Sequence, residues 1–409
     1  MLEKLSINPV GDHFTDSQEK SKVCKHVAKA WEKQCISFDQ GIDKMVTAQQ
    51  VIHDIKAPMR EFKTVIENNE VMMEYVPSGQ QFAFTENSIK NLCALGGMSS
   101  WAFEELRTDR TKETKKKGIE VVWKRDNRDA DVLQRLINLH LFQEDRFDLD
   151  KERLWRTWDN GTLRAVLSKD YIIVNNVWYL ESLKKLIPNG LISHDRSDAD
   201  ELYCNILIPD SIRVENDSDY GGMIVTGNSE VGTRRVSSIP SVFRAICANG
   251  CIWEDKQGQG INKVHRGTKF NFKILFEQIK KNLNKQIPLL PSIIAQALCA
   301  KQKGVNGVNM VKIFGAIANE FRFSKTDALG VLKEYPKEVL ILGKDSQSAF
   351  GVQASITRYG QTLSNKEWFH MDEVGGQIVQ MSQNKWDSII NKAKNMDTEE
   401  LNNIYGTTV

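Results

Sequence analysis

The spacing of apolar residues predicts a helical beginning for this chain. Residues 16–34 place apolar positions three and four residues apart, which indicates an amphipathic helix. A second helix is predicted from Pro58 through Ile66, because proline is favoured at the first helical position. We therefore expect residues 1–80 to form a helical N-terminal arm.

Residues 81–260 follow a different pattern, in which short β-rich runs precede helices. A strand at 81–84 leads into a helix that ends at Gly97, as helices often do at glycine. The β-rich runs 162–167 and 171–174 predict a hairpin, and an amphipathic helix follows them. This region is therefore predicted to contain a strand-strand-helix unit.

A second unit of the same kind is predicted further along the chain. A strand at 202–208 precedes two paired strands, 223–226 and 233–239, which are joined by a turn rich in Gly, Asn and Ser. Pro240 then opens a short helix that Gly250 closes. Residues 81–260 are therefore expected to form a core built on a mainly antiparallel sheet.

Residues 261–409 are predicted to begin with a basic segment and to continue as mostly helical sequence. Within the helical part, only the stretch 339–342 is strand-like. The fold class expected for the whole chain is α+β, with strand-strand-helix units between a helical N-terminal arm and a helical C-terminal region.

The composition excludes several classes of protein. Hydrophobic residues make up 41% of the 409 residues and charged residues 26%, which is typical of a globular chain. The longest run without charge, 286–300, contains two prolines and is shorter than the roughly 20 residues of a membrane span. The first residues lack the features of a secretory signal, and seven scattered cysteines argue against a disulfide framework. We expect a protein of the host-cell cytoplasm that does not contact membrane.

The formal net charge of +2 is the sum of opposed segments. Residues 256–285 contain eight Lys or Arg and one acid, whereas residues 195–219 contain eight carboxylates and two Arg. Residues 107–128 carry nine Lys or Arg and four acids, which fits either a solvated loop or a loop that contacts phosphate. The near balance of charge therefore does not exclude a polyanionic partner.

Binding of nucleic acid without base readout needs cations at phosphate distance and flat side chains on which bases stack. Three places offer this mixture: the tip of the first predicted hairpin, the second hairpin with its neighbouring helix, and the basic aromatic segment. The candidate residues are Arg164, Lys169, Tyr171, Arg234, Arg235, Arg244, Lys263, Arg266, Lys269, Phe270 and Lys273. For each residue taken singly, core packing or a solvated surface is the alternative.

Enzyme signatures are missing from the sequence. It contains no P-loop, no H-E-x-x-H and no G-x-S-x-G motif. Cys247, Cys251 and His265 could supply three metal ligands, but their spacing fits no common zinc site. The string from His194 to Glu201 could gather carboxylates around a cation, although such acidic loops are usually solvated. We expect no cofactor, and the sequence favours a binding protein over an enzyme.

Several motifs, in this order, resemble an uncharacterised family of phage- and plasmid-borne proteins, usually described as a phage/plasmid-like domain of unknown function. They are FTENSIKNLCALGGM, NGTLRAVLSKDY, GGMIVTGNSEVG, FRAICANGC and QASITRYGQ followed by EVGG. The likeness covers residues 82–253 and 349–376. The recurring residues of the family fall here on Arg164, Ser168, Tyr171, Asn228, Ser229, Glu230, Gly232, Arg244, Cys247, Asn249 and Gly250.

The resemblance implies a companion of replication, recombination and anti-restriction genes on mobile elements, without an assigned reaction. For Arg164, Glu230 and Arg244, a buried ion pair and a phosphate contact are both consistent. The order of predicted units is also similar to phage single-strand annealing proteins. The leading hypothesis is a phage or plasmid protein that binds nucleic acid, with single-stranded DNA favoured, as a homo-oligomer that assists recombination or replication. A metal-dependent enzyme that uses Asp195, Asp198, Asp200, Glu230 or Cys247, and an oligomeric scaffold or host-protein inhibitor, are the alternatives.

Overall fold

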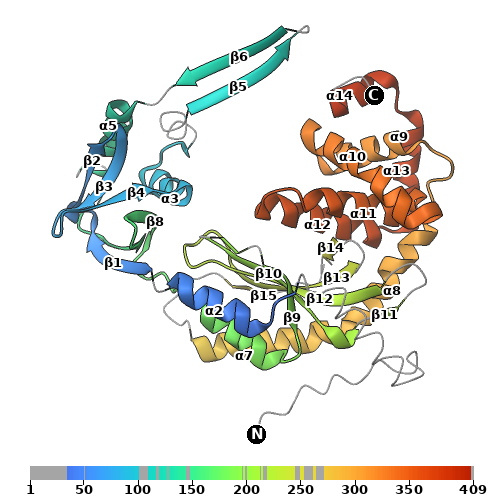
Figure 1. Ribbon diagram of the computed structural model, residues 1–409, viewed down its shortest axis with the longest axis horizontal. Helices are drawn as coiled ribbons and strands as arrows, with labels where there is room; N and C mark the ends of the chain where they lie inside the picture. The colour runs from blue at the N-terminus through green and yellow to red at the C-terminus, as the bar shows by residue number, and fades with distance from the viewer. Residues whose placement is uncertain are drawn as a thin grey trace.

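The computed structural model describes residues 35–49, 51–100, 109–116, 119–126, 129–143, 148–195, 197–198, 200–211, 213–214, 219–244, 249–252, 261–263 and 271–406. The described chain forms two sheets and a group of C-terminal helices, which follow one another around an open curve (Figure 1). Nearly all strand pairs are antiparallel, and the C-terminal region is helical. The predicted α+β fold class is confirmed.

The first sheet has six strands in the order β1-β7-β8-β4-β3-β2, and only the β4–β8 pair is parallel. Its core lies between the sheet and helices α3 and α5, around Phe82, Ile137 and Trp155. The elements are β1 (Ile52–Pro58), β2 (Phe62–Glu67), β3 (Glu70–Tyr75), β4 (Gln80–Phe84), α3 (Glu86–Gly96), α5 (Ala130–Leu141), β7 (Glu152–Trp158) and β8 (Thr162–Ser168). Strands on both sides of the predicted boundary at residue 80 therefore belong to one sheet.

The predicted strand and helix around Thr85 are confirmed. The Thr85 side chain caps α3 by accepting from the Ser88 amide at 3.1 Å. Gly97 ends the helix in the left-handed conformation with φ of +64°, which glycine adopts without steric cost.

The predicted helix from Pro58 is wrong. Pro58 ends the edge strand β1, and after one turn of 3₁₀ helix (Met59–Glu61) the chain continues as β2. Phe62 and Thr64 are buried while Lys63 is exposed, so the true period is two residues rather than 3.6. Within residues 35–80, only α2 (Phe38–Gln49) is an α-helix, and the helix predicted at 16–34 lies outside the described residues.

The first predicted hairpin is half right. Residues 162–167 do form a strand, β8, but its antiparallel partner is β7, which precedes it. The turn between the two strands is Asp159 to Gly161, where Gly161 has φ of +75°. Residues 171–174 belong to no strand. The helix predicted after them is confirmed as α6 (Asn176–Leu186).

The second sheet follows the order β14-β13-β12-β10-β9, with β11 beside β12 and β15 beside β13. Apolar residues on one of its faces form a core with α2, α6, α7 (Phe272–Gln286) and α8 (Leu290–Cys299), and Tyr203 and Val225 on the other face pack against Trp368 of α12 (Asn365–Gln380). The strands are β9 (Leu191–Asp195), β10 (Leu202–Leu207), β11 (Arg213–Val214), β12 (Asp219–Asn228), β13 (Val236–Arg244), β14 (Asn249–Ile252) and β15 (Ile261–Lys263), and α7 spans Phe272–Gln286. The predicted pairing of β12 with β13 is confirmed.

The short helix predicted from Pro240 is wrong, because Pro240 lies inside β13. On that edge, β15 pairs with residues 236–238 of β13, and β14 pairs with residues 241–244. Pro240 falls between the two pairings, where a strand can lack an N–H group without losing a ladder hydrogen bond. The strand-strand-helix repeat is therefore not reproduced in the second unit.

The C-terminal helices pack around one large apolar core that includes Phe314, Ile317, Trp386 and Ile389. They are α8 (Leu290–Cys299), α9 (Met310–Phe321), α10 (Lys325–Leu342), α11 (Ala349–Gly360), α12 (Asn365–Gln380), α13 (Gln383–Asn395) and α14 (Thr398–Tyr405). The strand predicted at 339–342 is wrong, since these residues form the last turn of α10. No helix in the described ranges is long and apolar enough to cross a membrane.

Strands β5 (Asp109–Lys116) and β6 (Ile119–Asp126) form a separate antiparallel hairpin. Among the described strands they pair only with each other. The hairpin extends away from the first sheet at the upper end of the open curve (Figure 1).

Candidate functional site

Buried charged and polar side chains join the first sheet to the second. Arg156 on β7 and Arg164 on β8 are 3% and 4% exposed, and they face Glu230, which is also 4% exposed. Glu230 and the fully buried Ser229 belong to the turn between β12 and β13. We call this group, with Asp54 and Asp200, the inter-sheet cluster.

Arg156 is the central cation of the inter-sheet cluster. Its Nε donates to Asp54 Oδ1 at 2.9 Å, and its Nη2 lies 3.6 Å from Glu230 Oε2. Its Nη1 also donates to the backbone carbonyl of Glu230. Glu230 Oε1 in turn accepts the Asn176 amide at 2.9 Å, at the start of α6. One guanidinium thus connects β1, β7 and the β12–β13 turn, and through Glu230 it reaches α6.

Arg164 lies inside the cluster rather than at an exposed hairpin tip, so that predicted placement is wrong. Its guanidinium carbon is 4.9 Å from the centre of the Trp158 ring. Burial, followed by the neighbouring charge of Arg156, lowers the pKa of Arg164 to about 10, whereas Glu230, Asp200 and Asp54 act in the opposite direction. Arg164 therefore stays protonated at neutral pH and contributes a buried positive charge to the inter-sheet cluster.

Tyr171 and Asn228 add hydrogen bonds around the turn between β12 and β13. The Tyr171 hydroxyl donates to the Ser229 carbonyl at 3.0 Å. Asn228 Nδ2 donates to the Val174 carbonyl at 2.6 Å and to Asn176 Oδ1 at 2.7 Å. The Tyr171 hydroxyl is therefore bound to the β12–β13 turn, and the residue does not stand at an exposed tip where bases could stack on it.

Asp200 is the unusual acid of the cluster. Burial is the largest cause that raises the pKa of Asp200 to about 6, and Asp198, Glu201 and Glu86 raise it further while Arg164 lowers it. Its backbone carbonyl accepts from Ser229 Oγ at 2.7 Å, so the residue is fixed against the turn.

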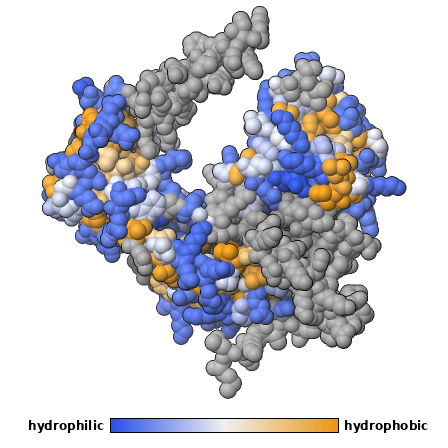
Figure 2. All heavy atoms as spheres, viewed as in Figure 1, coloured by the Kyte–Doolittle hydropathy of each residue, from blue (hydrophilic) through white to orange (hydrophobic). Residues whose placement is uncertain are grey.

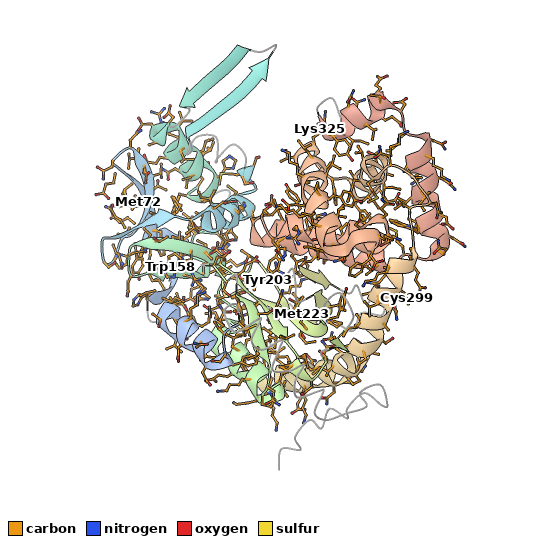
Figure 3. The ribbon with its side chains drawn as sticks, turned by 45° about the vertical axis from the view of Figure 1, so that its right-hand side comes forward. Met72, Trp158, Tyr203, Met223, Cys299 and Lys325 are labelled. Carbon is orange, nitrogen blue, oxygen red and sulfur yellow. The ribbon has the colours of Figure 1, made fainter. Side chains whose placement is uncertain are left out.

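Arg234 is covered by aromatic rings. Its Nε donates to Glu201 Oε2 at 2.8 Å, and its guanidinium carbon lies 5.2 Å from the Tyr203 ring and 5.0 Å from the Phe369 ring. Figure 3 marks Tyr203 on the second sheet and Trp158 on the first. Trp158 thus has Arg164 against its ring within the first sheet, and Tyr203 has Arg234 against its ring beside the second sheet. Arg234 is committed to internal contacts.

Two other predicted residues lie at the surface. Arg235 is exposed beside Arg234. Lys169 is also exposed, and its Nζ lies 3.7 Å from Glu152 Oε2. The predicted cations Arg164, Lys169 and Arg234 therefore do not form one continuous exposed surface with the basic segment.

Helix α7 presents a separate row of lysines. Its buried face contains Leu275, Ile279 and Leu283. The opposite side carries four lysines, three of them exposed and Lys280 half-buried, and Glu277 is the only acid of the helix. We call Lys273, Lys280, Lys281 and Lys285 the α7 lysine row. None of the four forms an ion pair within the described part of the chain. The surface over α2 and α7, at the bottom of Figure 2, is largely hydrophilic with a few apolar residues between.

Aromatic side chains stand at the beginning of the α7 lysine row. The rings of Trp178 on α6 and Phe272 on α7 meet edge to face, with centroids 4.9 Å apart. Phe272 is 41% exposed and the neighbouring Ile274 is 53% exposed. Lys273 lies between them in sequence and is exposed as well. Cations and one exposed flat side chain therefore occur together on this helix.

The remaining predicted residues lack a described side chain. Arg266, Lys269, Phe270, Cys247 and His265 lie outside the described residues. Arg244 and Lys263 are placed only through the pairing of β13 with β12, β14 and β15. Where the structure does describe side chains, no group of three or more His, Cys, Asp or Glu is placed to hold a metal ion.

Sequence reasoning missed Arg156 and Asp54 as members of the inter-sheet cluster. Asp54 lies just before Pro58, in the part of the chain predicted to be helical, although it belongs to β1. A signal did exist for Arg156, since it interrupts the apolar strand sequence LWRTW of β7. A charged residue inside a buried strand needs a partner, which the pattern alone could not name.

Comparisons with protein-family models, with curated proteins and with solved structures find no match to this chain. The resemblance to the phage- and plasmid-borne family therefore stays a prediction.

Proposed function

We propose that this protein binds nucleic acid through the α7 lysine row and the adjoining Trp178 and Phe272. The observation that carries the proposal is a helix with four lysines free of carboxylate partners in the described chain, beside an exposed aromatic ring. Phosphates attract such cations, and bases stack on such rings whatever their sequence.

The distribution of ion pairs supports α7 over the other helices. Lys385 and Lys392 of α13 both donate to Glu320, so two of the three lysines on α13 share one carboxylate. Lys337 of α10 likewise donates to Glu334. The α7 lysines have no such partners among the described residues. A polyanion bound at α7 would therefore displace no ion pair that the described residues form.

The finer predictions from the sequence are also part of this proposal. A source in a phage or plasmid and a role in single-strand annealing follow from the motif resemblance, and homo-oligomer formation follows from the annealing hypothesis. A metal-dependent enzyme and a scaffold or host-protein inhibitor remain alternatives. Light scattering after size exclusion measures the oligomeric state directly.

The test is a fluorescence-anisotropy titration of a labelled 20-nucleotide single strand, repeated at several salt concentrations. The triple variant Lys273→Gln, Lys281→Gln, Lys285→Gln should weaken binding at least about tenfold at low salt. The slope of log affinity against log salt should fall by about 2, because each phosphate contact on a single strand contributes about 0.7. Phe272→Ala should weaken binding by about 1–3 kcal/mol with little change in this slope.

A matched control comes from α13. The triple variant Lys385→Gln, Lys392→Gln, Lys394→Gln removes the same charge, but two of its lysines are already paired with Glu320. It should bind the single strand nearly as tightly as the unaltered protein. Absence of binding by the unaltered protein at low salt, or equal losses in the two triple variants, would refute the proposal.

A further inference from the structure

The β5–β6 hairpin has a regular register that fixes which positions share a face. Asp109 pairs with Asp126 and Lys116 with Ile119, without a shift between them. In an antiparallel pair, partners across the ladder lie on the same face, and successive residues alternate between faces. Every described position of the hairpin can therefore be assigned to one of two faces.

The acids of the hairpin strands all fall on one of these two faces, whereas the basic residues occur on both. One face holds Arg110 paired with Arg125 and Lys112 paired with Trp123, and further along it holds Lys116 and no acid. Its remaining positions are Thr114, Ile119 and Val121. The other face holds all four acids of the hairpin strands, Asp109, Glu113, Glu120 and Asp126, with two lysines, Lys115 and Lys124. The first face carries a charge of +4 and the second a charge of −2.

This arrangement is unfavourable for an isolated hairpin. Like charges directly opposite each other destabilise a strand pair, as Arg110 and Arg125 are placed to do. Two-stranded hairpins are marginal in water without a packing partner, and this hairpin joins no other described strand. A polyanion along the basic face would relieve the repulsion and add a packing partner to those that the described residues provide.

We propose that the basic face of the β5–β6 hairpin enters the major groove of duplex DNA. This inference goes beyond the proposed function, because it assigns duplex DNA to a second site on a different element. The major groove of B-DNA admits a two-stranded β-ribbon, whereas the A-form groove of duplex RNA is too narrow for protein side chains. Eight residues per strand span about 27 Å, close to one turn of the duplex at about 34 Å. Trp123, between the two arginine positions and the tip, adds a flat apolar residue to this face.

The experiment compares two double variants of the full chain on three probes. Arg110→Gln with Lys112→Gln removes two charges from the basic face, and Lys115→Gln with Lys124→Gln removes two charges from the acidic face. The probes are a 20-base-pair DNA duplex, the RNA duplex of the same sequence and the DNA single strand. Circular dichroism and thermal melting should coincide for all forms, because the hairpin adds no strand to either sheet.

The basic-face variant should lose about tenfold in affinity for duplex DNA at low salt, and its salt slope should fall by about 2. The acidic-face variant should change little, and neither should alter binding of the single strand. Three results would overturn the groove assignment. The two variants could lose equal affinity for duplex DNA, the basic-face variant could lose equal affinity for all three probes, or it could bind duplex DNA as tightly as the unaltered protein. In those cases the α7 triple variant still decides the proposed function, because it is read on the single strand.

Discussion

Arg156 offers the sharpest test of how the two sheets are held together. Its side chain is 4% exposed, and it pairs with Glu230, whose side chain is 5% exposed. Replacing Arg156 with Met removes the cation, keeps much of the packing volume and leaves Glu230 buried with the Asn176 amide as its remaining hydrogen-bond donor. Removing one member of a buried pair costs about 3–5 kcal/mol. Asp54 is 32% exposed, so water can solvate its carboxylate after Arg156 is removed. We therefore expect the free energy of unfolding to fall by about 3 kcal/mol, at the lower end of this range.

The assay is urea unfolding followed by tryptophan fluorescence, since Trp155 and Trp158 lie on the same strand as Arg156. With an m-value of about 3 kcal/mol/M, the midpoint should fall by about 1 M. Arg60→Met is the matched control, because Arg60 pairs with Asp150 at the surface, where both side chains are more than half exposed. It should cost less than about 1 kcal/mol.

A double variant sharpens this test. Adding Glu230→Met to Arg156→Met removes the stranded carboxylate, so the pair of substitutions should destabilise by less than the sum of the two single changes. If Arg156→Met moves the midpoint no further than Arg60→Met, the inter-sheet cluster is not what stabilises the joint.

Two other expected outcomes concern Asp200 and Gly330. The pKa of Asp200 is about 6 in the folded protein and about 3.9 in an unfolded chain, so stability falls as pH rises between these values and stays lower above pH 6. Asp200→Asn should therefore raise the free energy of unfolding at pH 8 by about 1 kcal/mol, after allowance for solvent screening. At pH 4 the gain should be much smaller. Urea unfolding measures both values, and an equal gain at the two pH values would contradict this reasoning. Gly330→Ala should destabilise by about 1–3 kcal/mol, because a Cβ there would overlap the Tyr359 ring on α11, although alanine favours a helix. Gly304→Ala, which meets nothing closer than 3.9 Å, is its control, and equal melting temperatures for the two variants would speak against overpacking.

The parts of the fold that the sequence predicted correctly depend on local rules. The Thr85 cap, the Gly97 stop and the β12–β13 pair all follow from residues close to one another in the chain. The errors at Pro58 and Pro240 have a common cause. Proline was interpreted as a helix start, whereas the actual positions are an edge strand and a gap between two pairings. Only tertiary pairing distinguishes these cases.

In the candidate site too, features set by local sequence were predicted and features set by distant partners were not. The basic and aromatic character of the segment that contains α7 was visible from composition, and Lys273 was named from it. The roles of Arg164 and Tyr171 were not visible, because their partners at Glu230 and Ser229 lie about 60 residues further along the chain. An arginine in a β-rich run is compatible with either a surface or a buried pair until those partners are located.

The inter-sheet cluster also has a consequence for the order in which this chain can mature. Arg156 obtains its contact to the Glu230 carbonyl across 74 positions, so a ribosome that has just released β7 and β8 has yet to make their anionic partner. Until the β12–β13 turn is synthesised, Arg156 and Arg164 have Asp54 and then Asp200 as the acids of the cluster, but they lack Glu230. We therefore expect the first sheet to reach its full stability only after the second sheet has formed.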